Sequence, residues 1–400
     1  MMLKKNLCSF FLTIVLLKSY SQYSIKVSAG ENCYHQVPVT VSLPKALDTK
    51  SQYELIDESK KYRLTVQLKD ASTIVFIPPF IKANSTTTYK LQKTAVKKSS
   101  VVRFIETNDG IEARVGNKTV FVYNTKVMMP PADSPAYYQR SGFIHPLKSP
   151  NGEIITDDFP AGHAHQHALF SAWTNTTFKK TFVDFWNQHL KKGTVEHIKV
   201  IGKEDGTVVG KLEILLSYKS IEFGEVLQEK WTVSLYPFSE YYLFDIESTQ
   251  TNTSSDTLYL NKYHYGGMGL RGSKYWNHDD KKNFKNAWHV VTNEGIKDSA
   301  ANHTHVKWVD ASGMIDKAEA GITVFDHPSN FRYPQAIRVH PTIPYFVFAP
   351  VVDGAFTINP GETYKSAFRY YVHDGKANVE RLNEVEKGYS NPPKVEVREK

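Results

Sequence analysis

Apolar and polar residues alternate with a period of two along much of this 400-residue chain. In the N-terminal part, Val37–Leu43 and Tyr62–Leu68 place an apolar side chain at nearly every second position, which predicts strands buried on one face. Short runs of this kind continue to Val372, separated by stretches rich in Gly, Asn and Asp. Stretches with the spacing of an amphipathic helix are few, and Asn378–Lys387 is the best candidate. The pattern therefore predicts an all-β fold of antiparallel sheets.

The polar stretch Gln92–Ser100 divides the chain into two parts. Residues 22–98 are predicted to form a β-sandwich accessory domain, because they contain short strands but no cluster of reactive side chains. Residues 101–387 are predicted to form a large antiparallel β-supersandwich that carries the functional site. Within it, Trp276–Lys307 is long and polar, as is typical of a loop at the rim of a site. Residues 388–400 are predicted to be a flexible tail.

The first 21 residues have the features of a secretory signal peptide. Two lysines precede the apolar run Leu7–Leu17, and small residues near Ser21 fit a cleavage site before Gln22. That run is too short to cross a bilayer and no later stretch is long enough, so no transmembrane segment is expected. The protein is therefore predicted to be periplasmic or secreted. Cleavage leaves Cys33 as the only cysteine, so no intramolecular disulfide is expected.

The chain has a formal net charge of +8, and loss of the signal peptide removes three of its lysines. The remaining positive charge suits an acidic ligand, such as a uronate-containing or sulfated glycan. It is equally consistent with a general contribution to solubility. No run of Lys or Arg exceeds two residues, which together with export argues against nucleic acid as a partner.

The segment Thr156–Trp186 contains the most concentrated group of reactive side chains. His163, His165 and His167 alternate within it, beside several aromatic and acidic residues. In an extended strand, alternate side chains lie about 6.5–7 Å apart on one face. Three imidazoles that project together indicate a binding or catalytic pocket, although a partly solvated strand surface has the same spacing. A divalent metal bound by all three is a further alternative, but the spacing is wide for one ion, so no cofactor is expected.

Other candidates lie elsewhere in the large predicted sandwich, except Trp173, which lies in the same segment. They lie beside glycines, aromatic residues or prolines, where a ligand could approach the backbone closely. Each is also compatible with a structural role, because buried His and Arg side chains normally have hydrogen-bonding partners. These candidates are Trp173, His197, Tyr263, His264, Arg271, Arg338 and His340.

A site rich in His, Tyr and Arg suits the abstraction of a proton next to a carboxylate. We therefore expect a carbon–oxygen lyase or dehydratase that acts on uronate-containing, sulfated oligosaccharides by β-elimination. The expected acid–base residues are His165, His167, Tyr263 and His264. The residues expected to bind the acidic oligosaccharide are His163, Trp173, His197, Arg271, Arg338 and His340.

Other functions remain open at this point. Asp157, Asp158 and Asp184 could provide the carboxylate pair of a glycoside hydrolase. A sugar epimerase or mutarotase would use acid–base residues of the same kind as a lyase. A glycan-binding protein without catalytic activity would need only the binding residues.

Several motifs occur in one order along residues 100–376. They resemble an exported bacterial family labelled "methane oxygenase PmoA-like". The resemblance implies a β-supersandwich similar to galactose mutarotase and a carbohydrate ligand. Many members of that family have Arg after the last histidine of the triplet, whereas this chain has Ala168. The motifs are the triplet segment, the stretch from Lys192 to His197, Tyr265–Arg271, Trp308–Gly313, Gly321–Asn330 and Phe368–Gly375.

Overall fold

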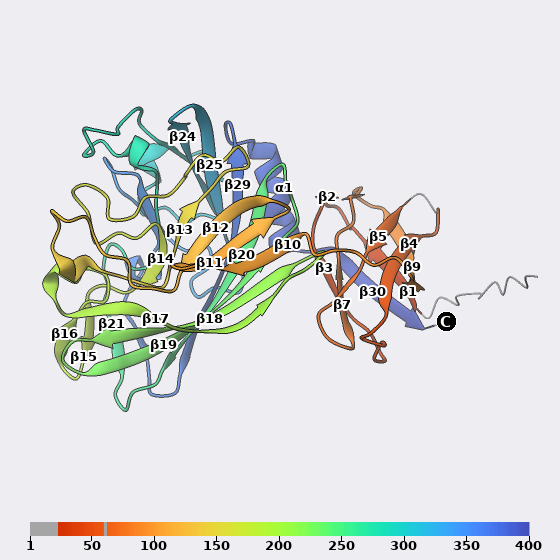
Figure 1. Ribbon diagram of the computed structural model, residues 1–400, viewed down its shortest axis with the longest axis horizontal. Coiled ribbons are helices and arrows are strands. Elements are labelled where there is room, and N and C mark those ends of the chain that lie inside the picture. The colour runs from red at the N-terminus through yellow and green to blue at the C-terminus, as the bar shows by residue number, and fades with distance from the viewer. Residues whose placement is uncertain (1–22, 60–61, 400) are drawn as a thin grey trace, which may run out of the picture.

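The computed structural model describes residues 23–59 and 62–399, which form two β-sandwiches side by side (Figure 1). The N-terminal sandwich (residues 23–94 with the last strand of the chain) lies at one end, and the large sandwich (residues 102–374) lies at the other. Strands dominate both, which confirms the predicted all-β fold. The predicted signal peptide, residues 1–21, lies outside the described residues. No helix in the described part of the chain is long and apolar enough to cross a membrane.

The N-terminal sandwich is built from three small antiparallel sheets. Buried and exposed residues alternate along its strands, as in Val39–Ser42, because one side of each sheet faces the core and the other faces water. Ile25, Leu55 and Ile74 are fully buried at its centre. In sheet order its strands are β30 (Lys394–Glu399), β1 (Tyr23–Ser28), β9 (Thr86–Thr94), β4 (Gln52–Asp57) and β5 (Arg63–Thr65); β3 (Val39–Ser42), β7 (Thr73–Phe76) and β6 (Gln67–Leu68); and β2 (Tyr34–His35) and β8 (Phe80–Ile81).

The last strand of the chain returns to the N-terminal sandwich, where β30 pairs with β1 along its whole length. Val395 and Val397 pack against the N-terminal core, because they alternate with charged residues and so point to one side of the strand. The sequence predicts a flexible tail over residues 388–400, whereas the structure has a paired strand here up to Glu399. The difference arises because the open edge of β1 supplies hydrogen-bonding partners that the tail lacks by itself.

The large sandwich consists of two eight-stranded sheets and one of four strands, all antiparallel. Side chains of the two large sheets meet between them; the rings of Phe121 and Phe244, for example, lie 5.3 Å apart. The first sheet is β10 (Val102–Glu106), β11 (Gly110–Val115), β12 (Lys118–Asn124), β13 (Phe143–Leu147), β14 (Leu169–Ala172), β22 (Gly267–Arg271), β27 (Tyr345–Phe348) and β26 (Ile337–Val339). The second is β17 (Gly193–Glu204), β18 (Gly210–Ser220), β19 (Gly224–Leu235), β20 (Tyr242–Asn252), β29 (Thr363–Asp374), β25 (Ala318–Asp326), β24 (Trp308–Ile315) and β23 (His289–Thr292).

The smallest sheet and the short helices complete this sandwich. The four-stranded sheet is β16 (Thr181–Val183), β15 (Thr176–Phe178), β21 (Leu258–Leu260) and β28 (Phe356–Ile358). The helices of one turn are η1 (Ala136–Tyr138), η2 (Gln188–Leu190), η3 (Lys274–Trp276), η4 (Asp298–Ala301) and η5 (Pro350–Val352). The single α-helix among the described residues is α1 (Val379–Ser390), close to the helix that the apolar spacing predicts.

A separate apolar cluster joins the two sandwiches. Val75 of the N-terminal sandwich packs in it with Trp308 of the large sandwich and Leu382 of α1. The side-chain amide of Gln67 also donates to the carbonyl oxygen of Val209 at 2.7 Å. These contacts pack the N-terminal sandwich against the large one, in addition to the covalent link between them.

Candidate functional site

Four neighbouring strands, β14, β22, β27 and β26, carry the candidate site. Arg271 at the end of β22 lies opposite Tyr345 of β27, and Val347 of β27 lies between Gly269 of β22 and Arg338 of β26. Directly opposed residues and alternate residues of an antiparallel sheet share a face. Arg271, Tyr345 and Arg338 therefore project from the same face, so the pairing brings together two predicted arginines that are far apart in the sequence.

An aromatic group covers this face beside the arginines. A Cβ at Gly269 would lie 2.9 Å from Cη2 of Trp186, so a glycine is needed for this indole to lie on the sheet. The Trp186 ring contacts Tyr265 and Tyr345 at centroid distances of 5.4 and 5.8 Å. Because Trp186 is itself buried, this group forms the floor of the site and leaves no indole surface for a ligand.

His163 and His165 do not lie on a strand, contrary to the prediction. The backbone forms two successive turns, in which the N–H of His163 donates to the carbonyl oxygen of Pro160 and the N–H of Gln166 donates to that of His163. Strand β14 begins only at Leu169. The proline at 160 and the glycine at 162 favour these turns. The two imidazole centroids nevertheless lie 5.7 Å apart.

His167 has no exposed surface and belongs to the core. Its Nδ1 lies 2.8 Å from Oδ1 of Asp158, and its Nε2 lies 2.8 Å from Oε1 of Gln188. Both ring nitrogens are occupied, so His167 can neither transfer a proton to a substrate nor share a metal ion with His163 and His165. This corrects the predicted catalytic role of His167 and the alternative of a three-histidine metal site. Within residues 23–59 and 62–399, no group of three His, Cys, Asp or Glu side chains is arranged to hold a metal ion.

His340 lies beside the two histidines that remain from the triplet. Its ring lies 5.7 Å from that of His163, and at the other end the ring of His165 lies 5.5 Å from that of His189. We call His340, His163, His165 and His189 the histidine row. Sequence reasoning missed His189, because it belongs to the separate turn η2 that only the fold brings beside His165.

The surroundings of His340 determine where its proton lies. Nδ1 accepts hydrogen bonds from the backbone N–H groups of Thr342 and Ile343, both at 3.3 Å. A nitrogen that accepts these bonds carries no proton, so the proton is assigned to Nε2. Burial, followed by the charge of Arg338 and the ring of His163, lowers the pKa of His340 to about 4. At neutral pH the side chain is therefore an uncharged N–H donor.

His163 and His165 are also uncharged at neutral pH. Burial lowers the pKa of His165 to about 3, with further contributions from His163 and His189. Burial and the charge of Arg271 lower the pKa of His163. Nδ1 of His163 is buried and has no hydrogen-bond partner among the described residues. A neutral imidazole can both accept and donate a proton, so the row has the means for acid–base chemistry.

Arg271 lies behind the row and has no exposed surface. Its Nη1 donates to Oε1 of Gln166 at 2.8 Å, whereas its Nε and Nη2 have no hydrogen-bond partner in the described part of the chain. Burial lowers its pKa to about 10, so the guanidinium stays charged at neutral pH. A buried guanidinium cannot hold a substrate carboxylate directly, which corrects the predicted contact. Arg271 acts on the row through its charge.

Arg338 is the accessible cation of the site. It is partly exposed, and Oδ1 of Asn302 holds its Nη1 at 2.9 Å. After burial, the charge of Arg338 is the largest cause of the lowered pKa of both His340 and His264. The ring of Tyr263 lies beside that of His264, with centroids 4.1 Å apart and the planes tilted by 39°. Tyr263 and His264 are therefore placed next to Arg338 and do not form part of the histidine row.

Two of the residues predicted to bind substrate lie in other surroundings. His197 lies on β17, in the second large sheet. Its Nδ1 lies 3.0 Å from the hydroxyl of Tyr123 on β12, in the first large sheet. Trp173 is buried and donates from Nε1 to Oε1 of Gln250 at 2.5 Å. The Trp173 ring also packs against Tyr364. Trp173 is thus a core residue, and His197 is paired with a residue outside the row.

The three aspartates of the hydrolase alternative have different environments. Asp158 is bonded to His167, and Asp184 is buried and accepts backbone hydrogen bonds. Both therefore stabilise the fold. Burial raises the pKa of Asp157 to about 7, against the opposing effect of the nearby Arg271. Asp157 lines a separate cleft of about 300 Å³.

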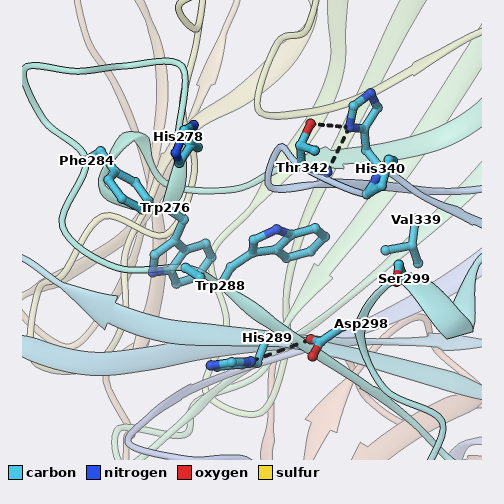
Figure 2. A pocket seen from close by; sticks show the side chains of 12 residues that line it. Trp276, His278, Phe284, Trp288, His289, Asp298, Ser299, Val339, His340 and Thr342 are labelled. Carbon is cyan, nitrogen blue, oxygen red and sulfur yellow. Dashed lines mark hydrogen bonds and ion pairs between the residues drawn. The ribbon is translucent and has the colours of Figure 1, made fainter.

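A cleft of about 390 Å³ opens beside His340, and Figure 2 shows its lining. Most of the lining residues belong to the long loop that was predicted to form a rim. Asp279 of this loop reaches the row: its Oδ2 would lie 3.1 Å from a Cβ at Gly162, and its charge acts on His163 and His340. Sequence reasoning missed Asp279, and its position in the predicted rim was the only available signal.

The motifs of the large sandwich correspond to a known family. Residues 110–387 match the model of DUF6807, a family of unknown function. The chain belongs to the DUF6807 family. The match includes the histidine row, Arg271 and Arg338, but it does not confirm the PmoA-like label of the predicted resemblance. None of the curated proteins matches this sequence.

Solved structures match this chain with low TM-scores and low sequence identity, as three of them show. An α-mannosidase from Enterococcus faecalis V583 matches with a TM-score of 0.42 and 11% identity over 95% of this chain and 46% of its own. The GH36 α-galactosidase AgaA from Geobacillus stearothermophilus matches with a TM-score of 0.33 and 10% identity, over 70% of this chain and 40% of its own. A galactose mutarotase related enzyme from Lactobacillus acidophilus matches with a TM-score of 0.30 and 11% identity, over 69% of this chain and 100% of its own. The chain thus spans about half the length of the mannosidase.

The prediction of a carbon–oxygen lyase is wrong, because the residues expected to carry out the elimination lie apart in the structure. The similar structures are named as two glycosidases and a mutarotase-related enzyme, and none of these three is named as a lyase. The four residues expected to carry out elimination do not converge. His165 lies in the row, His167 lies in the core, and Tyr263 and His264 lie beside Arg338.

Proposed function

We propose that this protein, after export, binds an acidic sugar at the histidine row and interconverts its anomers, as a mutarotase or a related epimerase does. The observation that carries the proposal is the row itself, in which the neutral imidazoles of His340, His163 and His165 meet beside Arg338. Uncharged imidazoles next to a fixed positive charge are suited to moving protons on a negatively charged ligand. The sugar class follows from the resemblance of the sequence motifs to a family with carbohydrate ligands.

The interconversion of anomers requires only the movement of one proton. His163 removes the proton from the anomeric hydroxyl O1, and the ring oxygen O5 accepts a hydrogen bond from Nε2–H of His340. The C1–O5 bond breaks as the C1=O1 carbonyl forms, and O5 takes the proton from the His163 imidazolium. Rotation about the C1–C2 bond and the reverse transfers close the ring with the opposite configuration at C1. The reaction needs no oxidant and forms no covalent bond to the protein.

The charges around the row support an anionic sugar. Arg271 and Arg338 place two positive charges there, one buried and one accessible. Nη1 of Arg338 is held by protein acceptors, while its Nε and Nη2 make no hydrogen bond with the described residues. The N–H groups of these two nitrogens are available to a carboxylate or sulfate group of the sugar. Arg271 would strengthen this binding through its field.

A glycoside hydrolase is the second candidate, and the environment of Asp157 favours it. Its pKa of about 7 suits a carboxyl group that protonates a leaving oxygen at neutral pH. Hydrolysis would also require a second carboxylate near Asp157, and Asp280 is the candidate, because its charge acts on Asp157 and Asp158 is bonded to His167. Release of reducing ends from an oligosaccharide by the wild type, lost in Asp157→Asn, would select hydrolysis over interconversion of anomers.

The proposal is tested by measuring the exchange of anomers directly. Polarimetry and exchange NMR follow freshly dissolved α-D-galacturonic acid, with α-D-galactose as the neutral counterpart. We expect His340→Ala or His163→Ala to reduce the catalysed rate by about 10²–10⁴-fold, the usual contribution of an acid–base group. His305→Ala is the matched control, because His305 is half exposed and pairs with Asp353 outside the row. A wild-type rate no faster than the uncatalysed reaction would overturn the proposal.

A further inference from the structure

We propose that the cleft beside His340 is a subsite for a second sugar ring, so that the ligand is an oligosaccharide with its reducing-end residue at the histidine row. At about 390 Å³ the cleft has the size of a site for a small ligand. This inference rests on the proposed function for the first ring. It is tested by binding as well as by turnover, so that the two can fail separately.

Trp276 forms a fixed wall of this cleft. Its ring is buried, and its Nε1 donates to the carbonyl oxygen of Met314 at 2.9 Å. A Cβ at Gly272 or Gly313 would lie only 2.8 or 2.9 Å from the indole, so two glycines leave the space that the ring occupies. The wall therefore exists before a ligand arrives, which lowers the entropic cost of binding.

Trp288 differs from Trp276 in being available to a ligand. It is partly buried and packs against the core of the large sandwich, but its Nε1 makes no hydrogen bond with the described residues. Figure 2 shows its indole extending into the middle of the cleft, among Trp276, Val339 and the turn that begins at His340. A partly exposed indole with a free N–H provides an apolar surface for a sugar ring and a donor for one of its hydroxyls.

Polar groups surround these aromatic rings. Asp298 accepts a hydrogen bond from the backbone N–H of Val290 at 3.0 Å and lies 3.5 Å from Nδ1 of His289. Its side chain is 55% exposed, so the carboxylate can still accept hydrogen bonds from sugar hydroxyls. Ser299 and Thr342 add hydroxyl groups to the lining. Aromatic rings with a few placed polar groups are the usual composition of a pocket for a small organic ligand.

The cleft is continuous with the row through His340. This residue lines the cleft, and its ring lies 5.7 Å from that of His163. A ligand bound between these two histidines therefore extends toward Trp288. The charges differ along this path, because Arg338 adjoins the row whereas Asp298 lines the cleft. We therefore place the carboxylate of the first ring beside Arg338, and the hydroxyl groups of the second ring against Trp288 and Asp298.

The test compares a monosaccharide with a trisaccharide of the same sugar. Isothermal titration calorimetry and the anomer-exchange assay are carried out with galacturonic acid and trigalacturonic acid. We expect the wild type to bind the trisaccharide at least about tenfold more tightly than the monosaccharide. Trp288→Ala should lose this preference while keeping its affinity for the monosaccharide. Trp288→Phe, which retains an aromatic ring, should keep part of the preference and shows that the loop still folds.

Tyr259→Ala is the control, because Tyr259 is an exposed aromatic residue on a strand of the four-stranded sheet. Equal affinity of the wild type for both sugars overturns the subsite. So does a preference that survives in Trp288→Ala, or the failure of both sugars to bind. If the trisaccharide binds through Trp288 but no anomer exchange occurs, the subsite stands and the proposed reaction falls.

Discussion

The histidine row and His167 show how one residue type acquires opposite roles within a few positions. His165 and His167 are separated by a single residue. His165 lies between two other imidazoles, whereas His167 lies between Asp158 and Gln188 with both ring nitrogens bonded. The first arrangement leaves ring nitrogens for a ligand, and the second uses them to stabilise the core. The partners of a histidine, more than its spacing, decide which role it has.

His373 extends this comparison to the direction of the pKa shift. Its Nε2 lies 2.9 Å from Oδ2 of the buried Asp310, and its Nδ1 lies 3.1 Å from the carbonyl oxygen of Gly375. Burial alone lowers the pKa of His373, but the hydrogen bond and the charge of Asp310 outweigh it and raise the pKa. In the row, burial and nearby positive charge act on His340 without such a partner, and the pKa falls. A carboxylate partner therefore raises the pKa of His373, whereas at the fully buried His167 burial outweighs the effect of Asp158 and the pKa is lowered.

The sharpest test of the comparison removes two residues of the row together. We expect the double variant His163→Ala/His340→Ala to lose at least about 10²–10⁴-fold in the catalysed rate of anomer exchange. Both side chains are only partly buried, so the midpoint of urea unfolding should change little. Polarimetry and tryptophan fluorescence measure the two quantities on one preparation. A large loss of stability in this variant would mean that the row is structural.

The converse change removes the buried histidine. We expect His167→Ala to lower the free energy of unfolding by about 2–4 kcal/mol, because it leaves Asp158 and Gln188 without their shared partner and opens a cavity. Urea unfolding at pH 7 measures the loss, with the exposed His305→Ala as the reference. A loss within experimental error of that reference would remove the distinction between His167 and the row.

The dependence of stability on pH should separate His340 from His373 next. The pKa of His340 is lowered from 6.5 to about 4. Its contribution to the free energy of unfolding is therefore present above pH 6.5. It is lost as the pH falls toward 4, because the unfolded chain binds a proton there before the folded protein does. The pKa of His373 is raised, so its contribution is present below pH 6.5 and is lost as the pH rises through its folded value. The free energy of unfolding should therefore be measured between pH 4.5 and 8. Compared with the wild type, His340→Ala should lose less stability at acidic pH, and His373→Ala should lose less stability at alkaline pH. If the free energy of unfolding depends on pH in the same way in both variants, the opposite pKa shifts assigned to His340 and His373 are wrong.

The smallest expected effect comes from the buried charge behind the row. Arg271 lowers the pKa of His163 and His340, so Arg271→Met should raise the pKa of both imidazoles. NMR titration of the imidazole protons measures this shift, and Arg103→Met, an arginine on β10 of the same sheet, is the matched control. Unchanged titration in Arg271→Met would show that burial alone sets the pKa values of the row.

Much of the fold could be predicted because it depends on local pattern. The alternation in Val39–Ser42 reappears as alternate burial, and the apolar spacing of Asn378–Lys387 reappears in α1. β30 could not be predicted in the same way, because Val395 and Val397 are too few to indicate a buried face. That strand exists because the edge of β1 accepts it, and an edge is a property of the folded sheet.

The sequence by itself determined which side chains were available to the site, namely a concentration of histidines and the two arginines Arg271 and Arg338. Only the tertiary structure decided how they were used: it turned His167 into the core, brought His189 and Asp279 beside the remaining histidines, and buried Arg271. The physical reason is that spacing along a chain sets the direction of a side chain only within one regular element. The pKa, the free donors and the exposed surface of each residue depend on partners from other strands and loops, which meet only when the sheets have formed.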